Sequence, residues 1–352
     1  MPLLVWFACL LALVVTPAGA STLEQGRIDA ASLRGNAAGL PSARNVTVYL
    51  PEGYAADPGK RFPVVYYLTS FFEDDRAPWA NNAAQALFDQ AIAKGVIGGF
   101  IMVTADCTKP AGGSWYVNSP ATGNWEDFVA RELIAWVDAR YRTLASSNSR
   151  GIAGDRMGGH GAIRLAMRHP EVFGAVYALH PIGMGPGVQP MFSRPNWQLL
   201  QDAKSLEDLR SDGFSLIFTS IFQAHLPDAA RAPLFFDPPA RLVAGKLAVD
   251  PALTERLNAS FFLERQIAAH VDNLRRLRGF SFDWARGDTN PDHISRSRPS
   301  PARWTRSACP TKRRNIAAAG ASGIGAKTGA STPRCCRSSR GLWCFSCPYS
   351  PP

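Results

Sequence analysis

Short apolar runs alternate with amphipathic helical stretches from Arg44 to Trp284. Phe62–Leu68 is largely apolar, as expected of a strand that is covered on both faces of a sheet. Trp125–Tyr141 has apolar residues at helical spacing and acids in its first turn, which is typical of a helix packed on a sheet. Alternating strands and helices join through right-handed crossovers. The pattern therefore predicts an α/β fold with a mostly parallel central sheet flanked by helices.

The expected elements follow one another in a regular order. Strands are predicted at Asn45–Leu50, Phe62–Leu68, Phe100–Thr104, Gly151–Gly154, Ala175–Leu179 and Phe280–Trp284. Helices are predicted at Ala83–Lys94, Trp125–Tyr141 and His160–His169, the last closed by Pro170. The first strand alternates between apolar and polar residues, which favours an early antiparallel strand. Residues from about 193 to 268 are less regular and contain several prolines, so we expect a cap or insertion there.

The N-terminal segment has the pattern of an export signal. Leu3–Val15 is apolar but too short to span a bilayer, and Thr16–Ala20 offers a small-residue cleavage site before Ser21. Residues 1–20 are therefore predicted to be a signal peptide, and the mature protein to be secreted or periplasmic, without a transmembrane span. Because no Lys or Arg precedes the apolar run, a membrane anchor is the alternative interpretation.

Charge divides the chain into two unlike parts. The formal net charge is +10, but the segment Ser295–Pro352 has 11 Lys or Arg and no Asp or Glu. Residues 1–294 hold the remaining 27 of the 38 basic side chains against 28 acidic ones, so the body is neutral. The basic segment lacks regular aromatic interleaving and helical spacing, so we expect no nucleic-acid partner.

The cysteines predict neither a disulfide framework nor a metal site. Cys107 is the only cysteine of the body, and the others lie in the signal peptide and in the basic segment. Cys344 and Cys347 have the spacing of a metal or redox pair, but no histidine follows His293 and no strand or helix pattern frames them. No metal and no cofactor are expected.

Residues 295–352 lose the apolar periodicity of the body and are rich in Ser, Arg, Pro, Gly and Ala. One explanation is an irregular, disordered tail. The other is a frameshift. When each codon is started at the third base of the present one, the junctions on either side of Ile324 permit His and then Trp. An apolar stretch after a histidine suits the end of an α/β chain, so we favour the frameshift.

A glycine-rich turn connects a predicted strand to a predicted helix. The run Gly154-Asp155-Arg156-Met157-Gly158-Gly159 has the Gly-x-Ser-x-Gly spacing of a nucleophile elbow, with Arg156 at the central position. In such a turn the central side chain stands above the sheet, and neighbouring backbone amides can stabilise an oxyanion. A guanidinium stays protonated at physiological pH and cannot attack a carbonyl carbon. Without further context, a glycine-rich turn that has no chemistry is an equally good interpretation.

The chain resembles the esterase family of α/β hydrolases that contains esterase D, feruloyl esterases and the mycolyltransferases. The resemblance covers about residues 46–293. It rests on Val48-Tyr49-Leu50-Pro51 with Gly53-Tyr54, Pro63-Val64-Val65-Tyr66-Tyr67-Leu68, Gly113-Ser114-Trp115-Tyr116-Val117-Asn118-Ser119, Trp125-Glu126-Asp127-Phe128 and Arg150-Gly151-Ile152-Ala153-Gly154 through Met157-Gly158-Gly159. It implies an α/β-hydrolase fold and carboxylic-ester hydrolase ancestry.

The resemblance also implies where a site would lie, and where this chain departs from the family. Family members usually have Ser where this chain has Arg156, and commonly His-Gly where it has Thr69-Ser70. The elbow and oxyanion residues implied are Gly154, Asp155, Met157, Gly158, Thr69 and Ser70. Asp288 resembles the triad acid, with Asp283 as the fallback. His293 is the only triad-histidine candidate in the sequence as written, and a solvated loop histidine is the alternative.

Aromatic residues near the expected site have two interpretations. Trp115 and Tyr116 line the pocket by resemblance, or they are core aromatics under a loop. His160 and His180 both fall near the carboxyl-end face of the predicted sheet, where ligands bind in such folds. Their spacing supplies no ligand set for a metal, so pocket-lining or structural roles are favoured.

These features leave three functional hypotheses. The first is a secreted esterase-family protein that has lost its hydrolase chemistry, with Arg156 binding a carboxylate or phosphate. The second is weak ester hydrolysis by a pocket water and the oxyanion donors. The third is non-catalytic binding of an acyl ester or glycan at the cell envelope. All three imply a small-molecule ester, acyl or glycan ligand, and the sequence predicts no particular oligomeric state.

Overall fold

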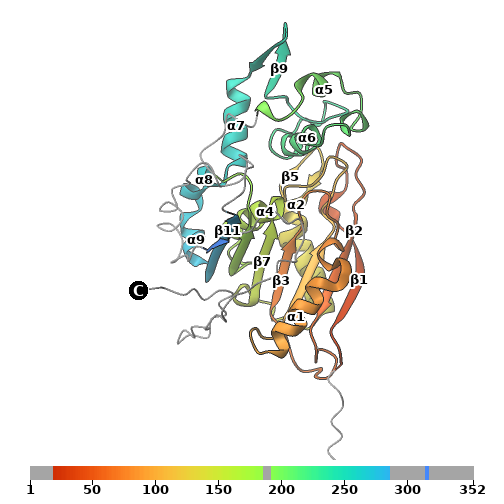
Figure 1. The fold of residues 1–352 in the computed structure, drawn as a ribbon, viewed down its shortest axis with the longest axis vertical. Coiled ribbons are helices and arrows are strands. Elements are labelled where there is room, and N and C mark those ends of the chain that lie inside the picture. The colour runs from red at the N-terminus through yellow and green to blue at the C-terminus, as the bar shows by residue number, and fades with distance from the viewer. Residues whose placement is uncertain (1–18, 185–191, 286–313, 317–352) are drawn as a thin grey trace, which may run out of the picture.

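The computed structural model describes residues 19–184, 192–285 and 314–316. Within these residues an eight-stranded sheet has the strand order β1-β2-β4-β3-β7-β8-β11-β12 (Figure 1). Its strands are Thr22–Asp29 (β1), Ala43–Leu50 (β2), Val64–Leu68 (β3), Ile101–Ala105 (β4), Arg150–Asp155 (β7), Ala175–Leu179 (β8), Gly279–Ala285 (β11) and Arg314–Ile316 (β12). β2 is antiparallel to β1 and β4, and the remaining pairs are parallel. The predicted α/β fold with a mostly parallel sheet is confirmed.

Each of the six predicted strands corresponds to a strand of this sheet, and the sequence missed two more. β1 has a mostly exposed, polar sequence, so it lacks the apolar run that marks the central strands. β12 lies in the segment predicted to be an irregular tail, and its three residues pair in parallel with Asp283–Ala285 of β11. The rest of residues 295–352, apart from β12, lies outside the described residues, as do residues 1–18.

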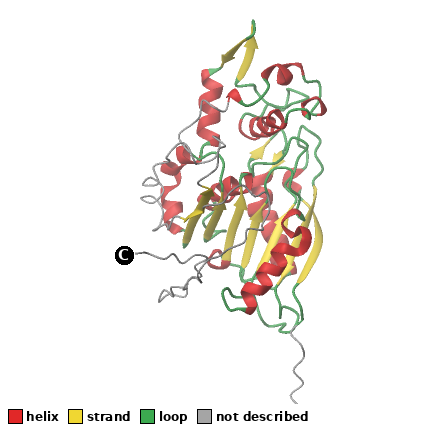
Figure 2. Ribbon diagram, in the orientation of Figure 1, coloured by secondary structure: helices red, strands yellow, loops and turns green. Residues whose placement is uncertain are grey.

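Helices cover both faces of the sheet (Figure 2). The helices between the strands are Ala83–Ala93 (α1), Trp125–Asp127 (α2), Ile134–Arg140 (α3) and Met157–Arg168 (α4), and a π-helical turn at Phe128–Leu133 joins α2 to α3. Because successive strand side chains point to opposite faces, Tyr49 and Met102 pack with Phe88 of α1, whereas Val48 and Val103 belong to the larger core that contains α3 and α4. α4 begins at Met157, three residues before its predicted start.

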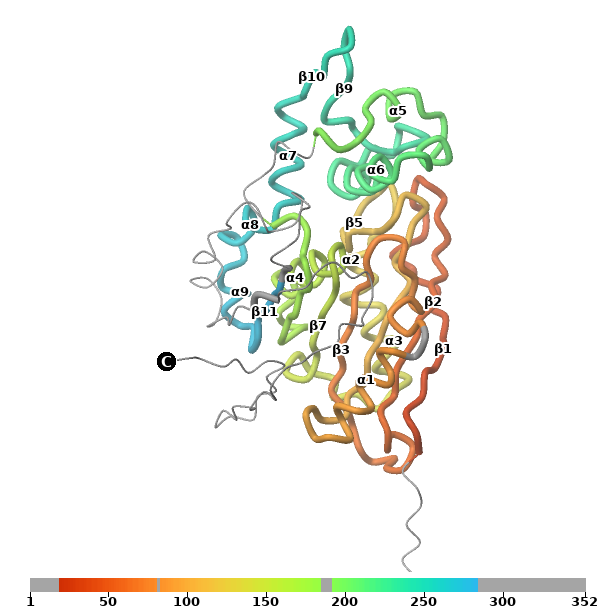
Figure 3. The backbone as a smooth tube through the Cα atoms, in the orientation of Figure 1, coloured from red at the N-terminus to blue at the C-terminus, as the bar shows by residue number. Residues whose placement is uncertain are grey.

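The chain between β8 and β11 contains the whole segment predicted as a cap or insertion. It forms Trp197–Asp202 (α5), Gly213–His225 (α6), the hairpin Ala240–Val243 (β9) and Lys246–Val249 (β10), Pro251–Phe261 (α7), Leu263–Gln266 (α8) and Val271–Arg276 (α9). Figure 3 shows α5, α6 and the hairpin beyond one end of the sheet, with α8 and α9 beside β11. The Asp212 and Asp250 side chains cap α6 and α7 by accepting hydrogen bonds from first-turn amides.

No helix among the described residues is both long and apolar enough to cross a bilayer. Cys107, the cysteine that falls within them, is buried and has no disulfide. Both findings concern the described part of the chain, so the predicted signal peptide stays a prediction.

Candidate functional site

The turn between β7 and α4 has the backbone of a strained elbow. Arg156, the residue between the strand and the helix, has φ 48° and ψ −107°, a conformation that costs a non-glycine residue about 1–3 kcal/mol. The flanking glycines make room for this turn. A Cβ on Gly158 would lie 1.9 Å from the Leu68 carbonyl oxygen, and one on Gly154 would lie 2.4 Å from the Gly158 backbone. The structure therefore places Arg156 at the tip of a turn that requires glycine on either side.

Arg156 and its neighbours form a small charged cluster at the ends of β7 and β8. The Arg156 Nη1 atom lies 3.3 Å from Asp155 Oδ2, and the arginine side chain is 41% exposed. The other carboxylate oxygen, Oδ1, lies 3.4 Å from Nδ1 of His180. The Asp155 carboxylate thus bridges a guanidinium and an imidazole. A protonated guanidinium supplies positive charge and hydrogen-bond donors at this tip but no nucleophile.

Two segments contribute possible oxyanion donors, and in one of them a neighbouring side chain already accepts from a backbone amide. α4 begins at Met157, and Arg156 makes no side-chain cap because a guanidinium has no acceptor. In the loop after β3, by contrast, the Ser70 amide donates to Glu73 Oε2 at 2.9 Å and the Thr69 hydroxyl donates to the Glu73 carbonyl at 2.9 Å. The Glu73 carboxylate already occupies the donor at Ser70. An incoming anion would meet the start of α4 rather than this loop.

Trp115, Tyr116 and His160 lie deep inside the protein. Both aromatic residues are fully buried, with φ 56° and 57°. The Trp115 indole donates to Ser220 Oγ on α6 at 2.8 Å, which ties this loop to the segment beyond the sheet. The Tyr116 hydroxyl donates to the Thr69 carbonyl at 2.8 Å. The two residues therefore connect their loop to the β3 loop and to α6, and a pocket-lining role for them stays a prediction.

His160 is four residues after Arg156 on the buried face of α4. Its ring stacks on Phe261 with centroids 5.2 Å apart, and Nδ1 lies 2.9 Å from the Ile182 carbonyl. Burial lowers the pKa of His160 to about 3. The imidazole is therefore neutral at physiological pH and packs as part of the core.

Two further buried groups near this core were missed by the sequence reasoning. His225 on α6 has Nδ1 2.8 Å from Ser260 Oγ, and burial lowers its pKa well below the usual value. The Lys109 amine lies 3.3 Å from Gln223 Oε1 and 3.4 Å from Thr122 Oγ1, and burial lowers its pKa to about 7. Neither residue had a sequence signal, because the partners that bury them come from distant segments of the chain. Among the described residues, no group of three or more His, Cys, Asp or Glu side chains could hold a metal ion.

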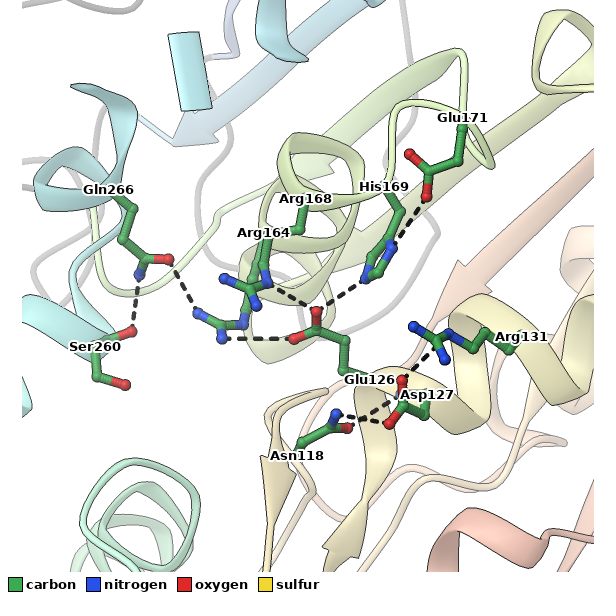
Figure 4. Close-up of polar contacts among 10 residues, drawn as sticks. All are labelled: Asn118, Glu126, Asp127, Arg131, Arg164, Arg168, His169, Glu171, Ser260 and Gln266. Atoms are coloured by element: carbon green, nitrogen blue, oxygen red, sulfur yellow. Dashed lines mark hydrogen bonds and ion pairs between the residues drawn. The ribbon is translucent and has the colours of Figure 1, made fainter. Parts of the chain in front are cut away.

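Glu126 is the centre of a buried ionic network that anchors the far end of α4 (Figure 4). Its carboxylate lies 2.7 Å from Arg168 Nε, 2.9 Å from His169 Nε2 and 3.5 Å from Arg164 Nη2. Burial by itself would raise the pKa of Glu126, but the His169 hydrogen bond and the two arginines outweigh it and lower the pKa to about 2. The network therefore holds the carboxyl-terminal end of α4, the helix that begins at the elbow.

The predicted triad acid and histidine fall at or beyond the end of β11. Asp283 is buried, and one of its carboxylate oxygens accepts a hydrogen bond from the Tyr177 hydroxyl of the neighbouring strand. Asp288 and His293 lie outside the described residues, so their assignment stays a prediction. The structure brings together Arg156, Asp155 and the start of α4, and adds His180 to them.

The parallel sheet, the strained strand-to-helix elbow and the covering helices define an α/β-hydrolase fold. The family profile described as "Putative esterase" matches residues 37–213, which is half of the chain. The chain belongs to this esterase family.

Proteins similar to this chain are named as esterases. Esterase MT1326 of Mycobacterium tuberculosis is 29% identical over 130 residues, which is 35% of this chain and 26% of that protein. An endo-1,4-beta-xylanase/feruloyl esterase of Xylanibacter ruminicola is 29% identical over 155 residues, 43% of this chain and 21% of that protein. The chain thus spans about a quarter of the length of these relatives. A solved ferulic acid esterase has a similar fold, with a TM-score of 0.56 and 19% identity over 85% of this chain and 90% of its own.

Proposed function

We propose that this chain is an exported esterase-family protein whose serine-dependent hydrolysis is impaired and whose elbow binds a small acyl ligand. The observation that carries the proposal is Arg156. It occupies the tip of the elbow, the position that displays a nucleophile in enzymes of this fold. The resemblance to the family suggests serine at that position in its members. Export is proposed from the apolar run and cleavage site in residues 1–20.

The states of other hydroxyl and thiol groups in the described chain support the loss of acyl-enzyme chemistry. The Cys107 thiol is buried, and burial raises its pKa far above the usual value, so it is not a thiolate. Ser70 and Ser114 are buried too. Asp155 stands beside the tip, and its two carboxylate oxygens face Arg156 and His180. None of these groups lies at the tip of the elbow, where the side chain of residue 156 lies.

The charges at the tip favour a ligand that carries a carboxylate. Arg156 is partly exposed and offers a planar set of donors. The start of α4 adds the partial positive charge of a helix N-terminus. Since the structural neighbour is described as a ferulic acid esterase and one relative as a feruloyl esterase, ferulate is a suitable probe. An acyl ester or glycan of the cell envelope is the alternative ligand class.

Binding and labelling experiments test the proposal together. We expect the purified mature protein to bind ferulate but to form no covalent adduct with a fluorophosphonate, which labels activated serines. The Arg156→Ala variant should bind ferulate ~10-fold more weakly, because a charge-assisted hydrogen bond contributes about 1.5 kcal/mol or more. Arg131→Ala is the matched control, since Arg131 is an exposed arginine that pairs with Asp127 away from the elbow.

Two results would count against the proposal. Stoichiometric labelling by the fluorophosphonate would show that an activated nucleophile is retained. If Arg156→Ala binds ferulate as tightly as wild type, the Arg156 guanidinium is not part of the ligand site. Export has its own check, because the protein recovered outside the cytoplasm should begin at Ser21.

A further inference from the structure

A carboxylate and an imidazole meet beside the elbow tip. Asp155 is the last residue of β7, and His180 directly follows β8, the neighbouring parallel strand in which Leu179 pairs with Asp155. Oδ1 of Asp155 lies 3.4 Å from Nδ1 of His180. Both side chains are partly accessible, with 23% and 33% exposed. The pair therefore lies at the carboxyl edge of the sheet, where an α/β fold binds its ligands.

The backbone holds His180 in a strained and well-defined position. Its φ is 42°, in the left-handed region that non-glycine residues seldom adopt, and its amide donates to the Asp283 carbonyl at 2.8 Å. On either side of it, the Arg156 amide donates to the Leu179 carbonyl at 2.9 Å and the Ile182 amide donates to the Arg156 carbonyl at 3.4 Å. The backbones of Arg156 and His180 are thus clamped together. Strain of this kind clusters at functional sites.

We propose that Asp155 and His180 form a general-base dyad that activates a water molecule for direct hydrolysis of a bound ester. The proposal rests on the ligand site described above and adds a catalytic step to it. With Asp155 on Nδ1, the imidazole carries its proton on that nitrogen, and Nε2 is the basic one. A carboxylate that holds the tautomer and stabilises the imidazolium is the arrangement that makes a histidine an effective base.

The reaction needs no protein nucleophile. As the water oxygen attacks the ester carbonyl carbon, one water proton moves to Nε2 of His180 and the carbonyl oxygen becomes an oxyanion. The Met157 amide at the start of α4 and the Arg156 guanidinium provide positive potential for this charge. The tetrahedral intermediate then breaks its bond to the alkoxide, which takes the proton from His180. The products are the carboxylic acid and the alcohol.

The surroundings distinguish His180 from the other histidines of the described chain. His160 and His225 are fully buried, and burial holds their pKa values far below the usual one. His169 is held in the Glu126 network. His270 lies between α8 and α9, away from the elbow. Only His180 combines partial exposure, a carboxylate on Nδ1 and a backbone contact with the elbow.

The test uses the mature protein, p-nitrophenyl acetate, and pre-treatment with a fluorophosphonate to silence any serine. We expect a slow hydrolysis that the pre-treatment leaves unchanged. His180→Gln should lower kcat ~100-fold, within the range that general-base catalysis contributes. His180→Gly should be equally impaired but should recover activity when imidazole is added. Because imidazole by itself hydrolyses p-nitrophenyl esters, the rescue is the rate in excess of imidazole without protein, and a histidine that is needed only for structure would show no such excess.

Asp155 is a positioning residue and needs a separate readout. Asp155→Asn should lower kcat ~10-fold or more and change KM less, because the amide no longer holds the His180 tautomer, whereas Arg156 loses only an ion-pair partner. His270→Gln is the matched control and should hydrolyse at the wild-type rate. Ferulate binding by each variant shows that it is folded, and it tests the ligand site independently.

Three outcomes would overturn the dyad. They are wild-type hydrolysis no faster than buffer, His180→Gln activity within twofold of wild type, and His180→Gly activity that imidazole does not restore. If ferulate still binds in any of these cases, the proposed ligand site stands and only the dyad fails. If hydrolysis follows His180 but ferulate does not bind, the dyad stands and the proposed ligand is wrong. If a His180 variant does not fold, Asp155→Asn decides the question through its kcat.

Discussion

Replacing Arg156 with glycine is expected to stabilise the folded protein, although it removes the side chain at the centre of the site. The native φ of 48° with ψ −107° costs arginine about 1–3 kcal/mol, and glycine adopts this conformation without that cost. Against this, glycine gains entropy in the unfolded chain, which costs about 0.4–1 kcal/mol. The ion pair with Asp155 is also lost, and for partly exposed side chains it contributes about 0–1 kcal/mol.

The balance favours glycine by about 1 kcal/mol, when the middle of each range is taken. Arg156→Ala is the matched variant, because alanine also loses the ion pair but keeps the Cβ that makes the turn strained. Glycine should therefore exceed alanine by about 1 kcal/mol or slightly more in free energy of unfolding. In a domain of this size that difference raises Tm by about 2–4 °C.

Urea denaturation followed by tryptophan fluorescence measures the free energies of unfolding, and calorimetry measures Tm. If Arg156→Gly is no more stable than Arg156→Ala, the elbow is not strained at residue 156. This turn would then lack the strained backbone that marks a nucleophile elbow.

Two further predictions concern the buried ionisable groups. Glu126→Gln should lower the free energy of unfolding by about 3 kcal/mol at pH 6, because Arg164 and Arg168 lose their buried counter-charge. The control is Glu171→Gln, on the exposed side of His169, which should lower it by less than about 0.5 kcal/mol. The pKa of Glu126 is lowered from 4.5 to about 2, so the stability difference between wild type and Glu126→Gln should be full above pH 4.5 and disappear as the pH falls toward 2. A stability difference that does not change with pH would contradict the ionic role of Glu126. His160 is a base, and burial lowers its pKa from 6.5 to about 3. Because its imidazole gains a proton in the unfolded chain at a higher pH than in the folded protein, the free energy of unfolding falls as the pH drops below 6.5. Denaturation at pH 7.5 and pH 5 should show His160→Phe gaining about 2 kcal/mol relative to wild type at the lower pH, and an equal pH response in both proteins would refute a buried neutral His160.

Much of the fold could be predicted from local sequence patterns. The apolar run at Phe62–Leu68 and the amphipathic stretch at Trp125–Tyr141 became β3 and the α2–α3 helical segment, with small shifts at the ends. These predictions held because a central strand must be apolar on both faces, and that requirement leaves a mark on consecutive residues. β1 was not predicted, because an edge strand with an exposed face need not be apolar.

The candidate site was predictable only in part. The spacing of glycines around Arg156 was enough to predict the elbow, since a Cβ at Gly154 or Gly158 would collide with the neighbouring backbone. The role of Glu126 was not readable, because its partners Arg164, Arg168 and His169 come from another helix more than thirty residues away. The same holds for Lys109, whose burial depends on α6.

The sequence by itself determined that this chain folds as an α/β hydrolase and that a guanidinium occupies the tip of its elbow. The α/β pattern and the elbow follow from local periodicity and turn geometry, and the resemblance of the quoted motifs to the esterase family implied the hydrolase fold. Only the tertiary structure decided what surrounds that guanidinium. Asp155 and His180 lie 25 residues apart in the chain, and they meet because β7 and β8 are parallel neighbours whose ends share one edge of the sheet.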